Sequence, residues 1–499
     1  MMKENIAKKS MQKNSVEKKN MEKKGMGKRS MEKKGVEKKS TKEKSTLKMI
    51  MVKRNIMNRI EVDHTKDLKV NSEAKELNDL LKKDAPFIYE MLNDYGKQAA
   101  FPNKGILVQS EEAKQAKLNA SVGQAFENNK SPMILNALSQ QINLSKTAFL
   151  YSPSSGQKNL RNIWREMILK KSPSIVSSLS LNNSTISLPV VTSGITNGLY
   201  LVGRLFAKKN VIIPDMMWEN YQLIFNDSEL ETFPLFDTNQ TRGFNFLGLK
   251  KKLNIQGDKV ILLNFPNNPT GYTILKKEAD EISKVIKECA ERGNNVVVII
   301  DDAYFGLFHE PDIFHESIFS KLCCLHERVL AVKVDGITKE IFAWGLRVGF
   351  ITYGFKGMNE KTASVLENKT ICAVRATISN VCTLSQVMAL NTLTSEGFNE
   401  SVHEKYESIK EKYNTVKNCL VKNKRYSEFF EPMPFNSGYF MCLMLKKHDA
   451  EQVRKVLIDK FSTGTIAQGK IIRIAYSCVS TDEIPKVFEN IYLACKSLK

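Results

Sequence analysis

Five continuous apolar runs, rich in β-branched residues, alternate with segments of helical composition along the chain. Strands that are apolar on both faces are typical of a parallel sheet covered by helices on both sides. The pattern therefore predicts an α/β fold with a mostly parallel sheet, whose ligands bind where the strands end. A further α/β region is predicted towards the C-terminus, with strands near residues 435–445 and 470–476. The five runs are residues 211–213, 260–263, 296–300, 329–332 and 348–351.

The basic charge of the chain is concentrated at its N-terminus. Its 75 Lys and Arg against 54 Asp and Glu give a formal net charge of +21, and residues 1–60 alone hold 20 of the former and 6 of the latter. Residues 11–45 repeat a charged five-residue unit that fits neither helix nor strand periodicity. Such a segment cannot offset the entropy of ordering, so residues 1–65 are predicted to be a disordered tail.

This tail has two interpretations. It can be an electrostatic arm that contacts RNA, DNA or an anionic membrane, or it can be a solvated repeat without a dedicated partner. No aromatic residues are interleaved with the lysines for base stacking, which favours the solvated repeat.

Cysteine, histidine and hydropathy patterns exclude several other classes of protein. The nine cysteines form no Cys-x-x-Cys pair, and adjacent Cys323 and Cys324 are not expected to bridge each other, so we predict a reducing, cytoplasmic compartment. The six histidines show no His-x-x-x-His spacing, so no metal site is predicted. No apolar run reaches about 20 residues, so no transmembrane helix is expected.

Polar side chains follow the apolar runs at positions where a parallel sheet binds its ligands. Asp301 and Tyr304 come directly after residues 296–300, and a carboxylate at the end of a buried strand is costly unless it is paired. Asn268 lies in the turn over residues 264–271, which two prolines and a glycine make sharp and rigid. Its amide is placed to donate to an anionic ring oxygen, and a protonated ring nitrogen would pair with Asp301.

A lysine and an arginine follow the next apolar run. Lys339 comes shortly after residues 329–332, and Arg347 follows eight positions later. An amine can form an imine with an aldehyde, and a planar guanidinium can grip a phosphate in a way that an ammonium cannot. Together with Asp301, this pair predicts pyridoxal 5'-phosphate as the cofactor.

Upstream, residues 188–198 predict a strand, a turn and the start of a helix. Backbone amides at a helix N-terminus, with a hydroxyl beside them, form a cradle for phosphate. Ser193, Gly194 and Ile195 are therefore predicted to hold the cofactor phosphate.

In this order, the Asn-Pro-Thr-Gly turn, Asp301 with Tyr304, and Lys339 with Arg347 resemble class I/II aminotransferases, which are fold-type I pyridoxal-phosphate enzymes. The resemblance runs from roughly residue 100 to the C-terminus and is nearest to the aspartate and aromatic branch. It implies an N-terminal arm with part of the small domain over residues 66–130, a large cofactor-binding domain over 131–404 and a small C-terminal domain over 405–499.

The resemblance also implies roles for five further residues. Trp218 would stack on the cofactor ring, and Tyr151 would reach the cofactor phosphate of a neighbouring subunit, which implies a homodimer with shared active sites. Gly123 lies in a segment similar to the loop that closes on the substrate carboxylate, and Arg473 would bind that carboxylate in a bidentate way. Arg375 would either bind a distal carboxylate in the partner's site or be structural, and the sequence leaves this open.

Two features depart from the family pattern. The family often has a serine three positions before the lysine, where this chain has Gly336, so the adjacent Thr338 is expected to supply the phosphate hydroxyl. The basic repeat tail has no counterpart in the family pattern.

The resemblance implies an aminotransferase that moves the amino group of an L-amino acid to a 2-oxo acid through pyridoxamine phosphate, with aspartate or aromatic amino acids as candidate donors. Lys339 would act as the acid and base. A decarboxylase, β-lyase or racemase on the same scaffold is the nearest alternative, because one fold hosts many chemistries. A more distant alternative is a ligand-sensing regulator that binds nucleic acid through residues 1–60.

Overall fold

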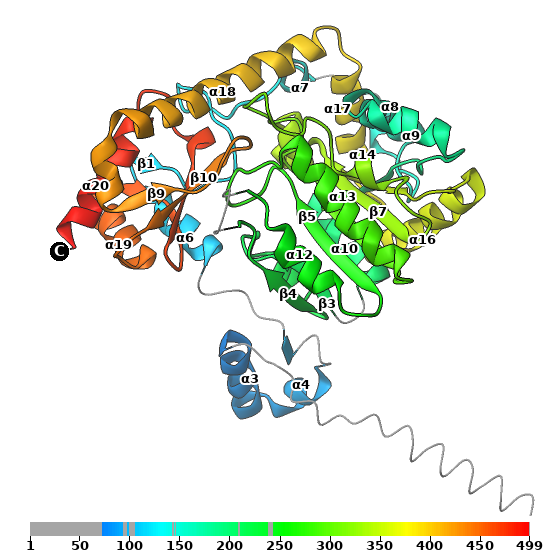
Figure 1. Cartoon of the computed structure of the whole chain (residues 1–499), viewed down its shortest axis with the longest axis horizontal. Helices are drawn as coiled ribbons and strands as arrows, with labels where there is room; N and C mark the ends of the chain where they lie inside the picture. Colours follow the sequence, from blue (N-terminus) through cyan, green and yellow to red (C-terminus); the bar gives the residue numbers. More distant parts are fainter. Residues whose placement is uncertain are drawn as a thin grey trace, which may run out of the picture. The chain divides into compact units, whose positions relative to one another are not determined.

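Figure 1 shows the computed structural model of the chain, which describes residues 72–92, 97–98, 105–141, 144, 146–207, 210–237 and 243–498. The chain divides into two units, Met1–Phe101 and Pro102–Lys499. The predicted disordered tail over residues 1–65 lies outside the described residues. In the first unit, α3 (Ser72–Asp84) is followed by α4 (Pro86–Met91), which begins with a proline where the missing N–H costs nothing.

The predicted parallel sheet is confirmed in the second unit as a seven-stranded sheet with the order β2-β8-β7-β6-β5-β3-β4. Every neighbouring pair is parallel except the two pairs that β8 makes with β2 and β7. Each of the five apolar runs supplies one of these strands. All residues of β5 and β8 are buried, which explains why their sequences are mostly apolar on both faces. The strands are β2 (Val190–Thr192), β3 (Asn210–Pro214), β4 (Glu229–Phe233), β5 (Lys259–Asn264), β6 (Val296–Asp301), β7 (Val329–Gly336) and β8 (Gly349–Gly354).

Helices flank and connect these strands. The α-helices of this part of the chain are α6 (Ile106–Glu112), α7 (Asn136–Ser139), α8 (Lys158–Lys171), α9 (Ser174–Leu181), α10 (Gly194–Phe206), α11 (Tyr221–Ile224), α12 (Phe246–Leu253), α13 (Lys276–Glu291), α14 (Phe319–Leu322), α15 (Ile337–Glu340), α16 (Glu360–Ile378) and α17 (Thr383–Leu393).

The large sheet is covered on both faces. On one face, Val334 and Ile351 lie against Gly198 of α10, where an added Cβ would be 2.8 Å and 3.6 Å from their side chains. On the other face, Phe350 stacks on Trp164 of α8 with ring centroids 4.3 Å apart. Because alternate residues of a strand point to opposite faces, α8 and α10 lie on opposite sides of the sheet.

The C-terminal part forms a smaller antiparallel sheet with the order β12-β13-β10-β9, and β1 from the N-terminal side pairs with β11 beside it. The long helix α18 runs through residues 404 and 405, and the domain boundary predicted there stays a prediction. The elements are β1 (Leu118–Asn119), α18 (Phe398–Lys422), β9 (Phe430–Pro432), β10 (Phe440–Leu445), α19 (Ala450–Phe461), β11 (Thr463–Gly464), β12 (Ile466–Gln468), β13 (Ile471–Ala475) and α20 (Ile484–Ser497).

The predicted strand over residues 435–445 begins later than expected, at Phe440. The reason is that the backbone N–H groups of Asn436 and Ser437 both donate to the carbonyl of Gly271, in the turn after β5, at 2.9 Å. These residues therefore join the small sheet to the large one instead of extending β10.

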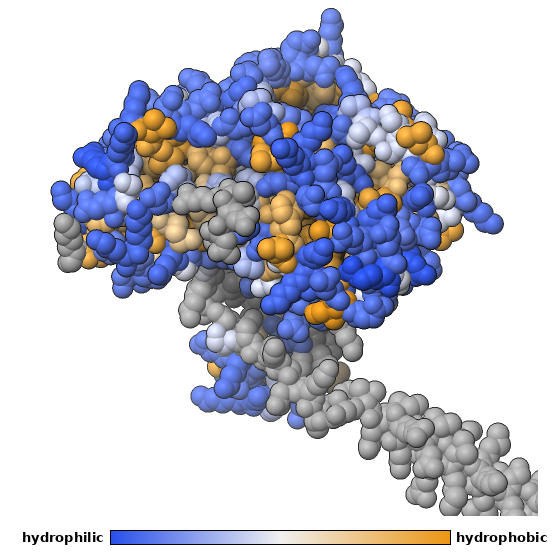
Figure 2. Space-filling view, in the orientation of Figure 1, coloured by the Kyte–Doolittle hydropathy of each residue, from blue (hydrophilic) through white to orange (hydrophobic). Residues whose placement is uncertain are grey.

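The face drawn in Figure 2 is mostly hydrophilic, with apolar side chains in scattered groups. Within the described ranges, no helix combines the length and hydropathy needed to cross a bilayer. In the same part of the chain, no group of three His, Cys, Asp or Glu side chains is placed to hold a metal ion.

Candidate active site

A cavity of about 240 Å³ lies where β5, β6 and the segment after β7 come together. Asn264 and Asp301 are the last residues of β5 and β6, and Lys339 lies in α15, which follows β7. Parallel strands bring their carboxyl ends to one edge, which explains why three separate motifs share one cavity. The lining residues are Ile106, Ser110, Ser121, Val122, Gly123, Ile195, Thr196, Trp218, Tyr221, Asn264, Asn268, Asp301, Ala303, Tyr304, Lys339, Phe440 and Arg473.

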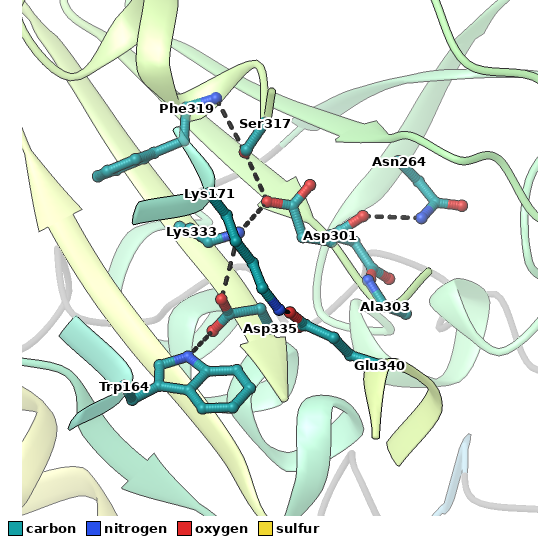
Figure 3. A network of polar contacts seen from close by, with 11 residues as sticks. Trp164, Lys171, Asn264, Asp301, Ala303, Ser317, Phe319, Lys333, Asp335 and Glu340 are labelled. Atoms are coloured by element: carbon teal, nitrogen blue, oxygen red, sulfur yellow. Dashed lines mark hydrogen bonds and ion pairs between the residues drawn. The ribbon is translucent and has the colours of Figure 1, made fainter. Parts of the chain in front are cut away.

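Asp301 is 3% exposed and is held by donors on both carboxylate oxygens. Its Oδ2 accepts from the Tyr221 hydroxyl at 2.6 Å, and its Oδ1 accepts from the N–H of Ala303 at 3.0 Å. Figure 3 shows the amide of Asn264 donating to the backbone carbonyl of Asp301, at 2.8 Å. Burial raises the pKa of this carboxyl, while Tyr221, Ala303 and the nearby Lys339 ammonium lower it in part. A cation in the cavity would complete the pairing of Asp301.

Tyr221 is a site residue that the sequence analysis missed. Burial, followed by the charge of Asp301, raises the pKa of its hydroxyl well above the ordinary value, so this hydroxyl remains a donor. Its ring lies 5.6 Å from that of Trp218 and nearly perpendicular to it. The signal in the sequence is the spacing Trp-x-x-Tyr, which brings the two rings together across the turn before α11, where the N–H of Tyr221 donates to the carbonyl of Trp218 at 3.0 Å.

Lys339 lines the same cavity, and burial lowers the pKa of its ammonium to about 8. Asp301 acts in the opposite direction and raises that pKa, whereas Arg347 lowers it further. The Nζ lies 5.3 Å from the centroid of the Tyr304 ring, and the Tyr439 hydroxyl donates to the Lys339 carbonyl at 3.3 Å. About one in ten such amines is neutral at pH 7, compared with about one in three thousand for an ordinary lysine. Lys339 is therefore suited to act as a nucleophile and a base.

The N-terminus of α10 has the features of an anion site. Gly194 has a φ of +80°, and an added Cβ would lie 2.5 Å from an Nη of Arg347. Only glycine therefore allows the guanidinium to approach this turn. Thr338, beside Lys339, has a buried Oγ1 without a hydrogen-bond partner among the described residues. A guanidinium and the free N–H groups at the start of a helix favour a phosphate here, where Ser193 and Ile195 flank Gly194.

The structure explains the absence of a serine at Gly336. This residue pairs with Gly349 in the register of β7 and β8. A Cβ on Gly336 would lie 2.7 Å from the carbonyl oxygen of Val348 and 2.8 Å from the Cα of Gly349. A serine would force the two strands apart, which leaves Thr338 as the hydroxyl next to Lys339.

Arg473 lies in β13 and is 5% exposed. One Nη donates to the carbonyl of Ser121 at 2.8 Å, the other donates to Oδ1 of Asn268 at 3.3 Å, and the guanidinium lies 4.6 Å from the centroid of the Phe440 ring. Its Nε has no hydrogen-bond partner among the residues that the structure describes. Burial lowers the pKa of this guanidinium. A buried cation with an unused N–H is suited to bind an anionic ligand.

Gly123 and Tyr304 line the cavity next to these groups. A Cβ on Gly123 would lie 3.3 Å from the Phe440 ring and 3.7 Å from the Tyr304 hydroxyl, so a larger residue would narrow the cavity. Burial raises the pKa of Tyr304 well above its ordinary value, so its hydroxyl stays protonated and can donate. The backbone N–H of Asn268 donates to Oδ1 of Asn264 at 2.8 Å, which fixes the turn after β5.

Two predicted site residues lie away from this cavity within one chain. Tyr151 is 92% exposed, and the preceding Phe149 and Leu150 are 74% and 64% exposed. Arg375 is exposed near the end of α16 and donates to the Ser379 hydroxyl at 2.7 Å. Tyr151 was predicted to act across a dimer interface, and Arg375 either to do so or to be structural, so their positions in a single chain leave these predictions untested.

The fold and the cavity together define an α/β protein that presents a lysine, an aspartate and the N-terminus of a helix beside an arginine at the ends of its strands. The model of the family described as aminotransferase class I and II matches residues 113–491. The chain therefore belongs to the class I and II aminotransferases, a family that depends on pyridoxal phosphate.

Individual relatives agree with this assignment. The probable aspartate/prephenate aminotransferase of Aquifex aeolicus is 25% identical over 280 residues, which are 54% of this chain and 63% of that protein. The aspartate aminotransferase of Pyrococcus horikoshii is 27% identical over 302 residues, which are 58% of this chain and 70% of that protein. The matched region thus spans about two thirds of the length of these relatives.

Solved structures confirm the predicted fold. An aminotransferase from Anaerococcus prevotii matches with a TM-score of 0.70 and 21% identity, over 81% of this chain and 99% of that one. The kynurenine aminotransferase of Pyrococcus horikoshii, solved in complex with PMP, matches with a TM-score of 0.66 and 16% identity, over 82% and 98% of the two chains. The chain therefore has the fold-type I architecture of these enzymes.

Proposed function

We propose that this chain is a pyridoxal-phosphate-dependent aminotransferase that transfers the amino group of an L-amino acid to a 2-oxo acid. The observation that supports this best is that one cavity contains the amine of Lys339, the carboxylate of Asp301 and the guanidinium of Arg473. These are the groups needed to bind an aldehyde cofactor, to pair with its ring nitrogen and to hold the carboxylate of an amino acid.

The residues present fit pyridoxal phosphate. Among the described residues, Asp301 has no cationic partner in direct contact, and it would pair with the protonated ring nitrogen, while Tyr304 and Asn268 would donate to the ring oxygen. The Trp218 ring would cover the face of the cofactor ring. When bound, the cofactor withdraws electrons from the Cα of the substrate. The residues proposed to hold the phosphate are Ser193, Gly194, Ile195, Thr338 and Arg347, with Tyr151 from a partner subunit.

Lys339 has two tasks in this proposal. Its amine would hold the aldehyde group of the cofactor covalently. The Nζ would also accept the proton of the substrate Cα and later donate it again, an acid-base role worth about 10²–10⁴-fold. The lowered pKa of this amine, about 8, lets it accept a proton near neutral pH.

Substrate binding is assigned to Arg473 and Gly123. The unused Nε–H of Arg473 and the backbone N–H of Gly123 would hold the α-carboxylate, because both residues line the cavity beside Lys339. Aspartate and aromatic amino acids are the proposed donors. If the donor is aspartate, Arg375 of a partner subunit would bind the distal carboxylate of this substrate.

We also propose that the enzyme is a homodimer with shared active sites and resides in the cytoplasm. The consecutive exposed residues Phe149, Leu150 and Tyr151 support the dimer, because an isolated chain gains nothing from exposing three large side chains in a row.

Mixing two inactive variants tests the shared site. Lys339→Ala lacks the amine, and Tyr151→Ala lacks the phosphate contact supplied to the partner. In a hybrid dimer, one site combines Lys339 from one subunit with Tyr151 from the other, so random mixing should restore roughly a quarter of the wild-type sites. The aminotransferase activity after co-refolding measures the fraction of restored sites. A mixture that is no more active than the two separate variants would contradict the shared site.

Uptake of pyridoxal phosphate by the apoenzyme is expected to accelerate as pH rises and to level off above about 8. The neutral amine is the nucleophile, and burial lowers the pKa of Lys339 from the ordinary 10.5 to about 8. Because Arg347 lowers this pKa and Asp301 raises it, Arg347→Leu should move the midpoint up and Asp301→Asn should move it down. Stopped-flow absorbance gives the midpoint, and a value near 10.5 in the wild type would contradict the prediction.

A single-turnover absorbance scan of the cofactor-loaded protein tests the function. Each amino acid of a panel is added without any oxo acid, and conversion of the cofactor to pyridoxamine phosphate is followed together with the product. Formation of a 2-oxo acid supports the aminotransferase. Loss of CO₂ with the amino group retained indicates a decarboxylase, and binding of the cofactor without any conversion overturns the proposal in favour of a regulator or another cofactor chemistry.

A further inference from the structure

A buried ion-pair network lies directly behind the cavity (Figure 3). Lys333 of β7 pairs with Asp302, the neighbour of Asp301, and with Asp335 at 3.2 Å. The three side chains of this network are only 1–2% exposed. Each carboxylate has one further donor, since the Ser317 hydroxyl donates to Asp302 at 2.6 Å and the indole N–H of Trp164 donates to Asp335 at 3.0 Å.

Lys333, Asp302 and Asp335 are not among the residues that line the cavity of the candidate active site. Lys333 and Asp335 line a separate void of about 10 Å³, which is at the lower limit for one water molecule. The aromatic ring of Phe305 closes this void, with Lys333 Nζ 4.7 Å from its centroid. No ligand can therefore reach Lys333, and its role has to be exerted through its two partners.

A gain in folding stability does not by itself explain why this buried ion-pair network is present. Burying three charges costs several kcal/mol per ion, and replacing a buried ion pair with apolar side chains of the same size is often neutral or stabilising. Apolar residues fill the neighbouring positions Val332 and Val334 of the same strand. A lysine at position 333 therefore suggests a task that an apolar residue cannot perform.

The network joins the two strand ends that bear the proposed cofactor residues. β6 ends at Asp301, which pairs in register with Val334, and the next residue, Asp302, binds Lys333. Asp335 is the second-last residue of β7 and precedes Lys339, in the short helix α15, by four positions. The single Nζ of Lys333 thus bridges the ends of β6 and β7 beyond their last paired residues.

A second ion pair acts on the same segment. Lys171 of α8 pairs with Glu340, the residue after Lys339, and both side chains line the same small void as Lys333 and Asp335, so the short helix α15 is tied to this network. Burial raises the pKa of Asp301 and of Asp302, and the charge of Lys333 lowers both in part. The charge of Lys333 thereby favours the ionised form of Asp301, the carboxylate that would pair with the ring nitrogen of the cofactor.

We propose that Lys333 is a positioning residue, which locks the ends of β6 and β7 together so that Asp301 and Lys339 engage opposite ends of one rigid cofactor ring. The inference rests on the proposed function, because it presumes that both residues bind pyridoxal phosphate. The spacing between Asp301 and Lys339 matters, because a displacement of reacting groups by about 1 Å lowers the reaction rate about a hundredfold.

Lys333→Met, prepared as the cofactor-loaded protein, tests this inference. Its cofactor dissociation constant is expected to rise about tenfold to a hundredfold, and the visible band of the bound cofactor should shift in position and in its pH midpoint. The groups that face Lys339 in that titration are Asp301, Tyr304 and Arg347. Lys252→Met removes a partly buried pair with Glu231 at 3.0 Å, remote from the strand ends, and should leave both properties unchanged.

A triple variant separates positioning from folding. Lys333→Met with Asp302→Asn and Asp335→Asn removes all three charges, and should regain the thermal stability lost in the single variant while cofactor affinity stays low. It also provides the test if Lys333→Met alone fails to fold.

Two results overturn the inference. One is wild-type affinity and an unchanged band in Lys333→Met, and the other is recovery of both in the triple variant, which would reduce Lys333 to a partner for two buried acids. Failure of the wild-type protein to form a borohydride-stable adduct with pyridoxal phosphate would instead overturn the proposed function on which the inference rests.

Discussion

Lys339→Ala is expected to leave a folded protein that cannot transfer an amino group. The change removes both the amine that holds the cofactor and the base that moves the Cα proton, and base catalysis alone contributes about 10²–10⁴-fold. Folding should survive, because within the described residues the Nζ of Lys339 makes no hydrogen bond or salt bridge, and its removal leaves no buried partner unpaired. Single-turnover conversion of a bound amino acid measures the loss.

Two controls sharpen this experiment. Lys356→Ala removes an exposed lysine after β8, at the opposite edge of the sheet, and should retain wild-type turnover. A small primary amine added to Lys339→Ala should restore part of the proton transfer, with a rate that follows the basicity of the amine. Substantial transamination by Lys339→Ala without an added amine would contradict the role assigned to Lys339.

The residues that the sequence could predict share one property, which is their place after an apolar strand. Asp301, Asn268 and Lys339 follow three separate runs, and a parallel sheet brings the ends of such runs to one edge. Their order along the chain was therefore enough to place them in one cavity. Arg473 was predictable for a different reason, since a guanidinium between apolar strand residues has to find an anion.

The residues that the sequence could not place depend on contacts between distant segments. Tyr221 lies 80 positions before Asp301, and only the folded chain brings its hydroxyl to the carboxylate. Lys333 is visible in the sequence as a charge inside a buried strand, yet its partner Asp302 belongs to the neighbouring strand and depends on the register. Tyr151 and Arg375 require a second chain, which no argument from one sequence supplies.

The late start of β10 illustrates a further limit. Residues 435–439 lie next to an apolar run, but they include Asn436 and Gly438, which are residue types depleted from strands. Asn436 also exchanges side-chain hydrogen bonds with the backbone of Thr273, 163 positions away. Local propensity and this tertiary contact with the turn after β5 therefore act together to start the strand at Phe440. The same contact ties the small sheet, which contains Arg473, to the turn that contains Asn268.

Arg473→Leu is expected to raise the KM for every amino donor and to lower kcat/KM several hundredfold, which corresponds to a loss of about 3–4 kcal/mol of transition-state stabilisation. The affinity for the cofactor should stay close to that of the wild type. The loss is large because Arg473 is buried, and leucine leaves the α-carboxylate of the substrate without a cation in a site that excludes water. Cofactor affinity should survive, because the residues proposed to hold the ring and the phosphate belong to the large sheet and its loops.

Arg473→Lys separates charge from geometry. Lysine keeps the positive charge but cannot replace the planar fork, in which two nitrogens already bind Ser121 and Asn268 and the third is unused. It should therefore recover only part of the lost kcat/KM. Arg375→Ala is the matched comparison, since it should affect acidic donors alone if that arginine binds a distal carboxylate. A loss in Arg473→Leu that is confined to acidic donors, or an equal loss of cofactor binding, would contradict the assignment of Arg473 to the α-carboxylate, because this group is common to all amino acids and absent from the cofactor.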